Sequence, residues 1–300
     1  MGSQQRDLDA LHRFIFEKSN IRGELVQLDN CWQAALSRCE YPVPLKKLLG
    51  ETMAAAALLA ATIKFDGRLT IQAQGDGVIS LLLVQCNSDG DIRGLINWSG
   101  EVDSGQSLAD MFGKGHLAIT IEPEDDGERY QGIVDLDGDS ISDSIEEYFR
   151  KSEQIDTRVW LGCNEDSAGG LMLQHLPGTA VSKEVEDEDA WDRVTILSNT
   201  ITTEEILSLD VKDILNRLYS EEDVRLFPAQ EYRFKCTCSR EKLEGVLRSI
   251  GGEDVYRLLE EKGNISIKCE YCGMDYEFDK IDVDVIFTVA DCVKGPETMQ

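Results

Sequence analysis

The spacing of apolar residues changes character along the first part of the chain. Residues 46–63 are rich in Ala and apolar on almost every side, which predicts a helix buried in a core. From residue 68 onward apolar and polar residues alternate in short runs separated by Gly- and Asp-rich turns, which indicates an antiparallel sheet. Residues 1–178 are therefore predicted to form an N-terminal α+β core domain in which helices pack on the sheet. Its predicted strands are 68–74, 78–86, 92–98, 116–121, 129–136, 157–163 and 171–175, with a further helix over 142–151.

Residues 179–235 differ from the first domain, and we predict a helical, acidic linker region there. The segment 183–189 is a run of charged residues, which is typical of a solvated connection. Thr202 begins a capping-box pattern, and Asp210 is placed to cap a helix over 211–218 whose apolar residues form one stripe. Helices this short need another surface to pack on. The linker is therefore expected to be marginally stable and readily released.

Four cysteines near the C-terminus form two short pairs, Cys236 with Cys238 and Cys269 with Cys272. Two such pairs on separate hairpin-like segments can deliver four thiolates to one tetrahedral Zn²⁺. The spacing therefore predicts one zinc ion bound by these four residues. The alternative is that they are structural cysteines that bind no metal.

Residues 236–300, which carry these cysteines, are predicted to form a small C-terminal zinc-binding α+β domain. The expected elements are a helix capped by Ser239, a second helix over 254–262 and a hairpin of 265–269 with 274–278. Apolar residues are few, and domains of this size commonly need a metal or disulfides to fold. Structural zinc contributes on the order of 10–16 kcal/mol in such units, so its removal is expected to unfold this domain.

Composition and charge restrict the environment and the partners of the chain. With 42% apolar residues and 300 residues in all, it can bury a full core in about two domains. A net charge of −27 would repel a polyanion, which argues against nucleic acid as a partner. The longest apolar run, 53–61, is too short to cross a membrane. Nine cysteines, without an apolar export signal at the N-terminus, predict a reducing cytoplasmic location.

The sequence contains no motif of a common enzyme class, so we expect no catalytic residues and no enzyme activity. The patterns G-x-x-x-x-G-K-[S/T], G-x-S-x-G and H-E-x-x-H are all absent. His12 falls on a predicted N-terminal helix, His116 at a strand start and His175 at a strand end, each without a ligand partner at suitable spacing. The cysteines outside the two pairs are expected to be small buried residues rather than redox groups, and Cys292 is assigned no role; the others are Cys31, Cys39, Cys86 and Cys163.

A four-cysteine zinc site could also serve two other functions. A zinc ribbon that binds nucleic acid is disfavoured by the acidic residues around the second pair, namely Glu270, Asp275, Glu277 and Asp279. A zinc-binding thiol-disulfide oxidoreductase would use Cys269 and Cys272. That chemistry usually places the first cysteine at a helix N-terminus to lower its pKa, whereas this pair is predicted in a hairpin turn. The oxidoreductase remains the alternative function.

The segments around both cysteine pairs resemble the 33 kDa chaperonins, a family of redox-regulated heat-shock holdases. The resemblance is carried by 234–241 (FKCTCSRE) and 269–273 (CEYCG), and Tyr271 stands where Phe would also fit. Further matching segments occur in order along the chain: 22–26, 64–67, 74–77, 127–132, 148–149, 152–154, 169–174, 176–177, 217–219 and 221–222.

The resemblance implies an ATP-independent chaperone that binds unfolding proteins and prevents their aggregation under oxidative stress. In the reduced, inactive state, the four cysteines would hold zinc, and the folded C-terminal domain would support the linker. Oxidation would join Cys236 to Cys238 and Cys269 to Cys272, with release of zinc and of the linker. The active form is expected to be a homodimer whose partners are client proteins, not nucleic acid or membrane.

Overall fold

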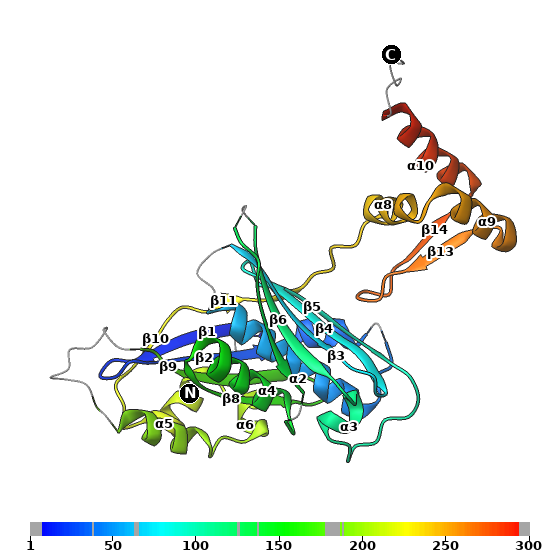
Figure 1. Cartoon of the computed structure of the whole chain (residues 1–300). Coiled ribbons are helices and arrows are strands. Elements are labelled where there is room, and N and C mark those ends of the chain that lie inside the picture. The colour runs from blue at the N-terminus through cyan, green and yellow to red at the C-terminus, as the bar shows by residue number, and fades with distance from the viewer. Residues whose placement is uncertain are drawn as a thin grey trace, which may run out of the picture. The chain divides into compact units, whose positions relative to one another are not determined.

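A computed structural model of the chain describes residues 8–37, 39–62, 66–124, 127–136, 138–177, 187 and 189–293 (Figure 1). The chain divides into two compact units, Met1–Lys235 and Cys236–Gln300. Of the charged run predicted over 183–189, only Asp187 and Asp189 are among the described residues. Within the described part of the chain, no helix has the length and apolar character needed to cross a bilayer.

Two six-stranded sheets form the framework of the first unit. The first sheet has the order β10–β1–β2–β9–β8, with β11 also paired to β1, and the second has the order β12–β5–β4–β3–β6–β7. Neighbouring strands are antiparallel except for β12, which runs parallel to β5. The predicted α+β class is confirmed, but the strands belong to two sheets rather than one. Their bounds are β1 Ala10–Phe16, β2 Ile21–Leu28, β3 Gly67–Gln74, β4 Ile79–Asn87, β5 Asp91–Trp98, β6 His116–Pro123, β7 Tyr130–Asp135, β8 Asp156–Cys163, β9 Ala168–His175, β10 Val224–Leu226, β11 Gln230–Glu231 and β12 Arg233–Phe234.

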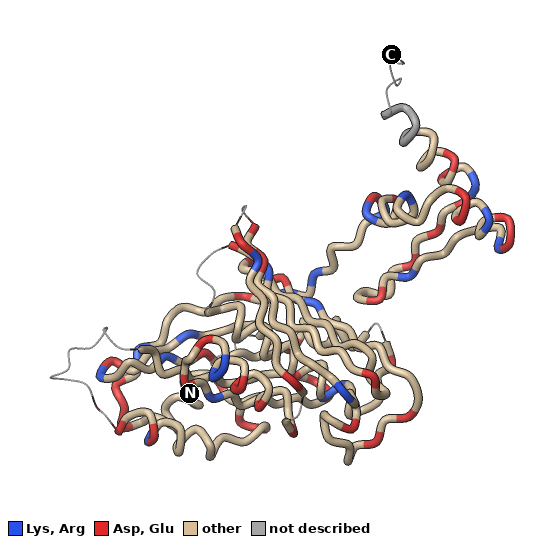
Figure 2. Tube along the Cα trace, viewed as in Figure 1, with Lys and Arg blue, Asp and Glu red and all other residues tan. Residues whose placement is uncertain are grey.

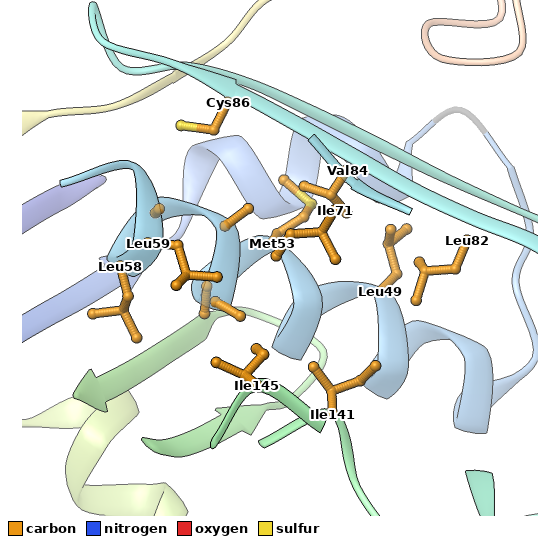
Figure 3. Packing of buried hydrophobic residues seen from close by; sticks show 14 of the residues in the cluster. Leu49, Met53, Leu58, Leu59, Ile71, Leu82, Val84, Cys86, Ile141 and Ile145 are labelled. Atoms are coloured by element: carbon orange, nitrogen blue, oxygen red, sulfur yellow. The ribbon is translucent and has the colours of Figure 1, made fainter. Parts of the chain in front are cut away.

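The main core of the first unit surrounds helix α2 (Val43–Ala60), which packs against strands of both sheets. This is the buried, Ala-rich helix that the sequence predicted. In Figure 3, Met53 of α2 lies beside Ile71 of β3 and Val84 of β4, and all three are fully buried. Shorter helices complete this layer: α1 Asn30–Leu36, α3 Leu108–Phe112, α4 Ile141–Tyr148 and the π-helical turn η1 Phe149–Glu153. A helix apolar on all sides is stable here because both of its faces are covered.

Strand β1 corrects the prediction of a helix around His12. Leu11 of β1 packs into the core around α2, whereas Phe14 and Phe16 pack on the opposite face of the first sheet. Because both faces are buried, the strand lacks the apolar-polar alternation that marks a half-exposed strand. The positions of His116 at the start of β6 and His175 at the end of β9 agree with the prediction.

The predicted linker region forms three short helices within the first unit: α5 Ala190–Ser198, α6 Thr203–Ser208 and α7 Val211–Tyr219. Thr202 forms the predicted capping box with Glu205, and the Asp210 side chain accepts a hydrogen bond from the Lys212 backbone amide. The apolar stripe predicted on α7 is buried. These caps and this stripe explain why the sequence forms helices here, although each is too short to be stable alone.

The second unit has its own small set of elements. Helices α8 (Arg240–Ile250) and α9 (Gly252–Lys262) precede a hairpin of β13 (Ile265–Lys268) and β14 (Asp275–Phe278), and α10 (Lys280–Val293) follows it. Ser239 caps α8 as predicted, because its side chain accepts a hydrogen bond from the Lys242 amide. Helix α10 was not among the elements predicted from the sequence. The core of this unit is small and consists of Leu247, Val255, Leu259, Ile265, Phe278, Val283 and Ile286.

Candidate metal centre

Two segments of the second unit position the four paired cysteines. Cys236 and Cys238 lie in the irregular segment that leads into α8, immediately before its N-cap. Cys269 and Cys272 lie in the turn between β13 and β14, whose last paired residues are Lys268 and Asp275. The turn is closed by two backbone hydrogen bonds, from the Cys269 amide to the Met274 carbonyl (2.9 Å) and from the Gly273 amide to the Cys269 carbonyl (2.7 Å).

The four sulfur atoms form one compact cluster, with every Sγ within 4.8 Å of the others. The shortest contacts join the two pairs, since the Sγ atoms of Cys236 and Cys269 are 3.6 Å apart and those of Cys238 and Cys272 are 3.4 Å apart. A Zn–S bond of about 2.3 Å in a tetrahedral site places the sulfur atoms about 3.8 Å from one another. The shortest distances between the sulfur atoms are therefore close to those of a tetrahedral zinc site.

Tyr276 of β14 provides a polar partner for the cluster that the cysteine spacing alone does not predict. Its hydroxyl donates a hydrogen bond to Cys238 Sγ over 3.2 Å. Partial burial raises the pKa of Cys238, but hydrogen bonds from Tyr276 and from the other thiols outweigh burial and lower that pKa to about 7. Burial raises the pKa of Cys272 to about 12. One thiolate is thus favoured near neutral pH, and a bound metal cation would favour loss of the remaining protons.

The contacts beside the cluster tie α8 to the hairpin and to α10. The Arg240 guanidinium lies 4.4 Å from the Phe278 ring centre, forms an ion pair with Asp282 at 2.6 Å and donates a hydrogen bond to the Glu277 carbonyl at 2.8 Å. Three of the four cysteines are only half-buried, and Cys272 is 9% exposed. The metal centre therefore lies at the edge of a thin core rather than inside a thick one.

Apart from Cys292, the other cysteines and the histidines singled out in the sequence belong to the first unit. Cys31 and Cys86 are buried in the first unit, and Cys39 and Cys163 are half-buried there. His175 stacks on Trp191 with ring centres 5.6 Å apart. Among the described residues, the four paired cysteines are the one group of three or more potential ligands that could hold a metal ion. The side chain of Cys292 lies outside the described part of the chain.

The linker helices cover an apolar face of the first sheet, which we call the linker-covered face. It consists of Phe14, Phe16, Ile21, Leu25, Leu171 and Leu173, and it packs against Ala190 and Val194 of α5 and against the buried stripe of α7. The Tyr219 ring of α7 lies 5.0 Å from that of Phe16 and 6.0 Å from that of Phe14, measured between centres. The linker therefore hides aromatic and aliphatic surface that the sheet alone would expose.

Polar contacts hold the linker helices in register on this face. Gln27 of β2 donates hydrogen bonds to the carbonyls of Ile206 (2.6 Å) and Leu209 (2.9 Å). The hydroxyls of Ser198 and Tyr219 are 2.5 Å apart and link α5 to α7. The indole of Trp160 donates to the Asn199 side chain at 3.1 Å, at an exposed position. The contacts of Gln27 with Ile206 and of Ser198 with Tyr219 are buried, whereas those of Gln27 with Leu209 and of Trp160 with Asn199 are partly buried or exposed. Because the helices are short, their stability depends on this docked position.

Comparisons with known proteins agree with this architecture over nearly the whole chain. The chain is 44% identical to the 33 kDa chaperonin of Methylobacillus flagellatus over 96% of this chain and 97% of that protein. It is 45% identical to the 33 kDa chaperonin of Pseudomonas fluorescens, with 95% of each chain covered. A solved structure of the 33 kDa chaperonin (heat shock protein 33 homolog) of Thermotoga maritima has a TM-score of 0.79 and 21% identity, and covers 95% of this chain and 99% of its own.

The family model described as Hsp33 protein matches residues 9–279. This range contains both sheets, the linker helices and all four cysteines of the candidate metal centre. The resemblance seen in the sequence is confirmed, and the relatives carry the name of a chaperone rather than of an enzyme. On its sequence and its fold, the chain belongs to the Hsp33 family of 33 kDa chaperonins.

Proposed function

We propose that this chain is a redox-regulated, ATP-independent holdase that binds unfolding proteins and prevents their aggregation under oxidative and heat stress. The observation that carries the proposal is the cluster of four sulfur atoms within 4.8 Å of one another in a unit with a thin core. A chaperone whose fold depends on such a cluster can be switched by any oxidant that reacts with the thiols.

In the reduced, inactive state, Cys236, Cys238, Cys269 and Cys272 would hold one Zn²⁺ as thiolates. The donor set and the spacing of the sulfur atoms fit this metal. When bound, the metal supplies folding free energy to the second unit, which has few buried apolar side chains. The fold of the second unit would in turn support the linker region that precedes it in sequence.

Oxidation would convert the four thiols into two disulfides, Cys236–Cys238 and Cys269–Cys272. The shortest sulfur contacts join the two segments instead, but those contacts depend on the folded unit. Once that unit unfolds, closure of a short loop costs less entropy than closure of a long one, which favours partners close in sequence. Each disulfide takes away two thiolate ligands, so the remaining set cannot bind zinc tightly.

Release of the linker would uncover the linker-covered face, and we propose that this face contributes to client binding. Six aliphatic and aromatic residues become accessible there together. Exposed apolar patches of this kind bind the apolar segments of unfolding proteins. The net charge of −27 would keep the chain in solution while the patch is exposed (Figure 2).

We further propose that the active form is a homodimer and that the chain works in the cytoplasm. The family resemblance supports both, and free thiols suit a reducing compartment. The thiol-disulfide oxidoreductase is less well supported. The pKa of Cys238 is lowered, but Cys238 is not part of the Cys-x-x-Cys segment, and burial raises the pKa of Cys272, which is.

The test combines metal and thiol quantitation with an aggregation assay. Reduced protein is expected to carry one zinc per chain and to suppress client aggregation poorly. After peroxide treatment at elevated temperature, we expect loss of zinc, loss of at least the four thiols of the cluster and strong suppression of light scattering without ATP. A reduced protein that is folded throughout without metal would contradict the proposal, as would zinc loss without any gain of activity.

A further inference from the structure

Two cysteines outside the metal centre lie in the part of the core where the last strand joins the second sheet. Cys31 lies in the first turn of α1 and Cys86 near the end of β4, and each is 1% exposed in the core around α2. Helix α1 packs against β5 and β12. The register places Cys86 opposite Ile92 of β5, and Ile92 opposite Phe234 of β12. In Figure 3, Cys86 lies above α2, at the end of the core away from Leu82.

The segment 230–235 covers both thiols. Tyr232 is 4% exposed, its hydroxyl donates a hydrogen bond to the Ala57 carbonyl of α2 at 3.1 Å, and its side chain also hydrogen-bonds with Cys86. Two residues later, the Phe234 backbone hydrogen-bonds to the Cys31 thiol. One short stretch of chain therefore closes over the two cysteines at once.

The same segment is joined to its surroundings by short elements. Strands β11 and β12 span two residues each. Asp91 pairs with Arg233 at 2.5 Å and with Lys235 at 2.7 Å, but both cations are more than half exposed, and ion pairs of this kind add little stability. The next residue in the chain is Cys236, the first ligand of the candidate metal centre. The segment that covers the two thiols is therefore directly continuous in sequence with the part of the chain that would unfold on loss of the metal.

While the segment is in place, the two thiols are protected from oxidants. Burial raises the pKa of both Cys31 and Cys86, so that they remain protonated at neutral pH. A thiol reacts with peroxide only as the thiolate, and only when the oxidant can reach it. Removal of Tyr232 and Phe234 would change both conditions, because water and peroxide would then reach the sulfur atoms.

We propose that Cys31 and Cys86 form a second redox pair, which residues 230–235 cover and which oxidises to a disulfide once those residues detach. This inference rests on the proposed function, in which the linker region is released. It replaces the expectation from sequence that these cysteines have no redox role. The disulfide would hold α1 against β4 and prevent Tyr232 from returning to its site, so that the chain stays active until a reductant is present.

The chemistry needs one peroxide for each pair. The first thiolate attacks a peroxide oxygen, the O–O bond breaks, and a sulfenic acid forms with loss of one water. The second thiolate attacks the sulfenic sulfur, so that the S–S bond forms, the S–O bond breaks and a second water leaves. The two sulfur atoms together lose two electrons, which the peroxide accepts. A disulfide requires Cα atoms within about 7 Å, so the proposal includes a movement of α1 toward β4 into the space that Tyr232 leaves.

The first test opens the cover without oxidation. In the full-length, reduced, zinc-bound Tyr232→Ala variant, we expect iodoacetamide to label Cys31 and Cys86 at least about tenfold faster than in wild type. Truncation of a buried aromatic residue destabilises its packing by more free energy than a tenfold increase in labelling rate requires. Cys163 of β8 is the internal control, and its labelling rate is expected to change less than about twofold. Tyr232→Phe keeps the ring and should give a smaller increase.

If Cys31 and Cys86 label no faster than in wild type in either variant, residues 230–235 do not cover them and the inference is wrong. A parallel rise at Cys163 in Tyr232→Ala would indicate general unfolding, and the Tyr232→Phe rates then decide. In that variant, faster labelling of Cys31 and Cys86 with an unchanged labelling rate of Cys163 supports the inference that residues 230–235 shield the two thiols.

The second test follows wild-type protein during peroxide activation by peptide mapping without reduction. We expect a peptide linked through Cys31 and Cys86 to appear after zinc is lost, while Cys163 stays reduced. If zinc is lost and aggregation is suppressed while Cys31 and Cys86 remain thiols, the second redox pair is disproved and the proposed function stands. If zinc is never lost, the proposed function fails, and the labelling of the Tyr232 variants still decides whether the cover exists.

Discussion

The cores of the two units differ in what holds them together. In the first unit, α2 is covered by a sheet on each side, and large side chains such as Met53, Leu49 and Trp32 are fully buried. In the second unit, a few apolar residues lie beside four clustered thiols, three of which are half-buried. Apolar burial is sufficient for the first fold, whereas we propose that the second also needs a metal. On this proposal, an oxidant would unfold the second unit and leave the first intact.

The linker helices differ from both cores in what stabilises them. They bury an apolar stripe against the linker-covered face, but they are short and lie at the surface of the first unit. Their stability comes from a neighbouring surface rather than from their own length. The predictions below test this order of stability, beginning with the change that we expect to be largest.

Removal of zinc by a chelator from the reduced protein should unfold the second unit, because it removes on the order of 10 kcal/mol of folding free energy. Hydrogen exchange is the measurement. Amides of α8, α9 and the β13–β14 hairpin are expected to lose protection, and those of α2 and β3 to keep it. Equal loss in both units would show that the two cores are not independent, and full protection in the second unit would remove the role assigned to the metal.

Replacement of Cys269 and Cys272 by Ser should separate zinc binding from oxidation. Two thiolates remain, which are too few for tight tetrahedral zinc, so the linker should be released in reduced protein. We expect the double variant to suppress aggregation of a heat-denatured client several-fold better than reduced wild type. The control is Cys163→Ser, which leaves the sulfur cluster unchanged. A folded double variant that is no more active than reduced wild type would contradict the proposal that bound zinc keeps the linker docked and the chaperone inactive.

A charge placed on the buried face of α5 should release the linker while the metal centre stays intact. Val194 is 0% exposed against the linker-covered face, whereas Ile196 of the same helix is 66% exposed. Val194→Asp buries an unpaired carboxylate and should destabilise docking of the helix by about 3 kcal/mol or more.

Ile196→Asp is the matched control and should change little. Light scattering of an aggregating client, together with the zinc content, measures both variants. We expect activity without oxidant only for Val194→Asp, with zinc retained in both. Similar activity of the two variants would show that the buried face is not what the linker hides.

A smaller effect concerns Glu24 of β2, which is 2% exposed. Burial raises the pKa of its carboxyl group from 4.5 to about 7. Below about pH 4.5 the group is neutral in both the folded and the unfolded chain. Between pH 4.5 and 7 it ionises mainly in the unfolded chain, so the free energy of unfolding should fall as the pH rises through this window.

Glu24→Gln removes this dependence and should raise the free energy of unfolding by up to about 3 kcal/mol at pH 8, with little difference at pH 4.5. Urea unfolding of the first unit at several pH values measures it. The exposed Glu128→Gln is the control and should give the wild-type profile. A constant difference between wild type and Glu24→Gln at all pH values would indicate a packing effect instead of a titration.

The features predicted correctly from sequence depend on residues close together in the chain. Thr202 and Asp210 cap helices through backbone amides two or three residues away, so their patterns were sufficient. The two cysteine pairs were likewise visible as local spacing, and the structure brings them together. The family resemblance, also carried by short segments, added the chaperone class.

The features that sequence could not supply depend on long-range packing. His12 was assigned to a helix because β1 is covered on both faces, by the core around α2 and by the linker helices. The parallel pairing of Phe234 with Ile92 joins residues far apart in the chain, and no local pattern encodes it. The hydrogen bond from Tyr276 to Cys238 depends on the fold of the hairpin beside α8, so only the structure shows it.

The pairing of β2 with β9 has a consequence for how the chain folds during synthesis. Residues 21–28 pair with residues 168–175, so the first sheet cannot cover α2 until the ribosome has passed residue 175. At about 5–20 residues per second, synthesis of the chain between α2 and β9 takes roughly 6 to 23 s. Throughout that time the apolar face of α2 that the first sheet covers in the folded protein is exposed on the nascent chain. A protein that we propose to protect others from aggregation therefore passes through an aggregation-prone stage each time it is made.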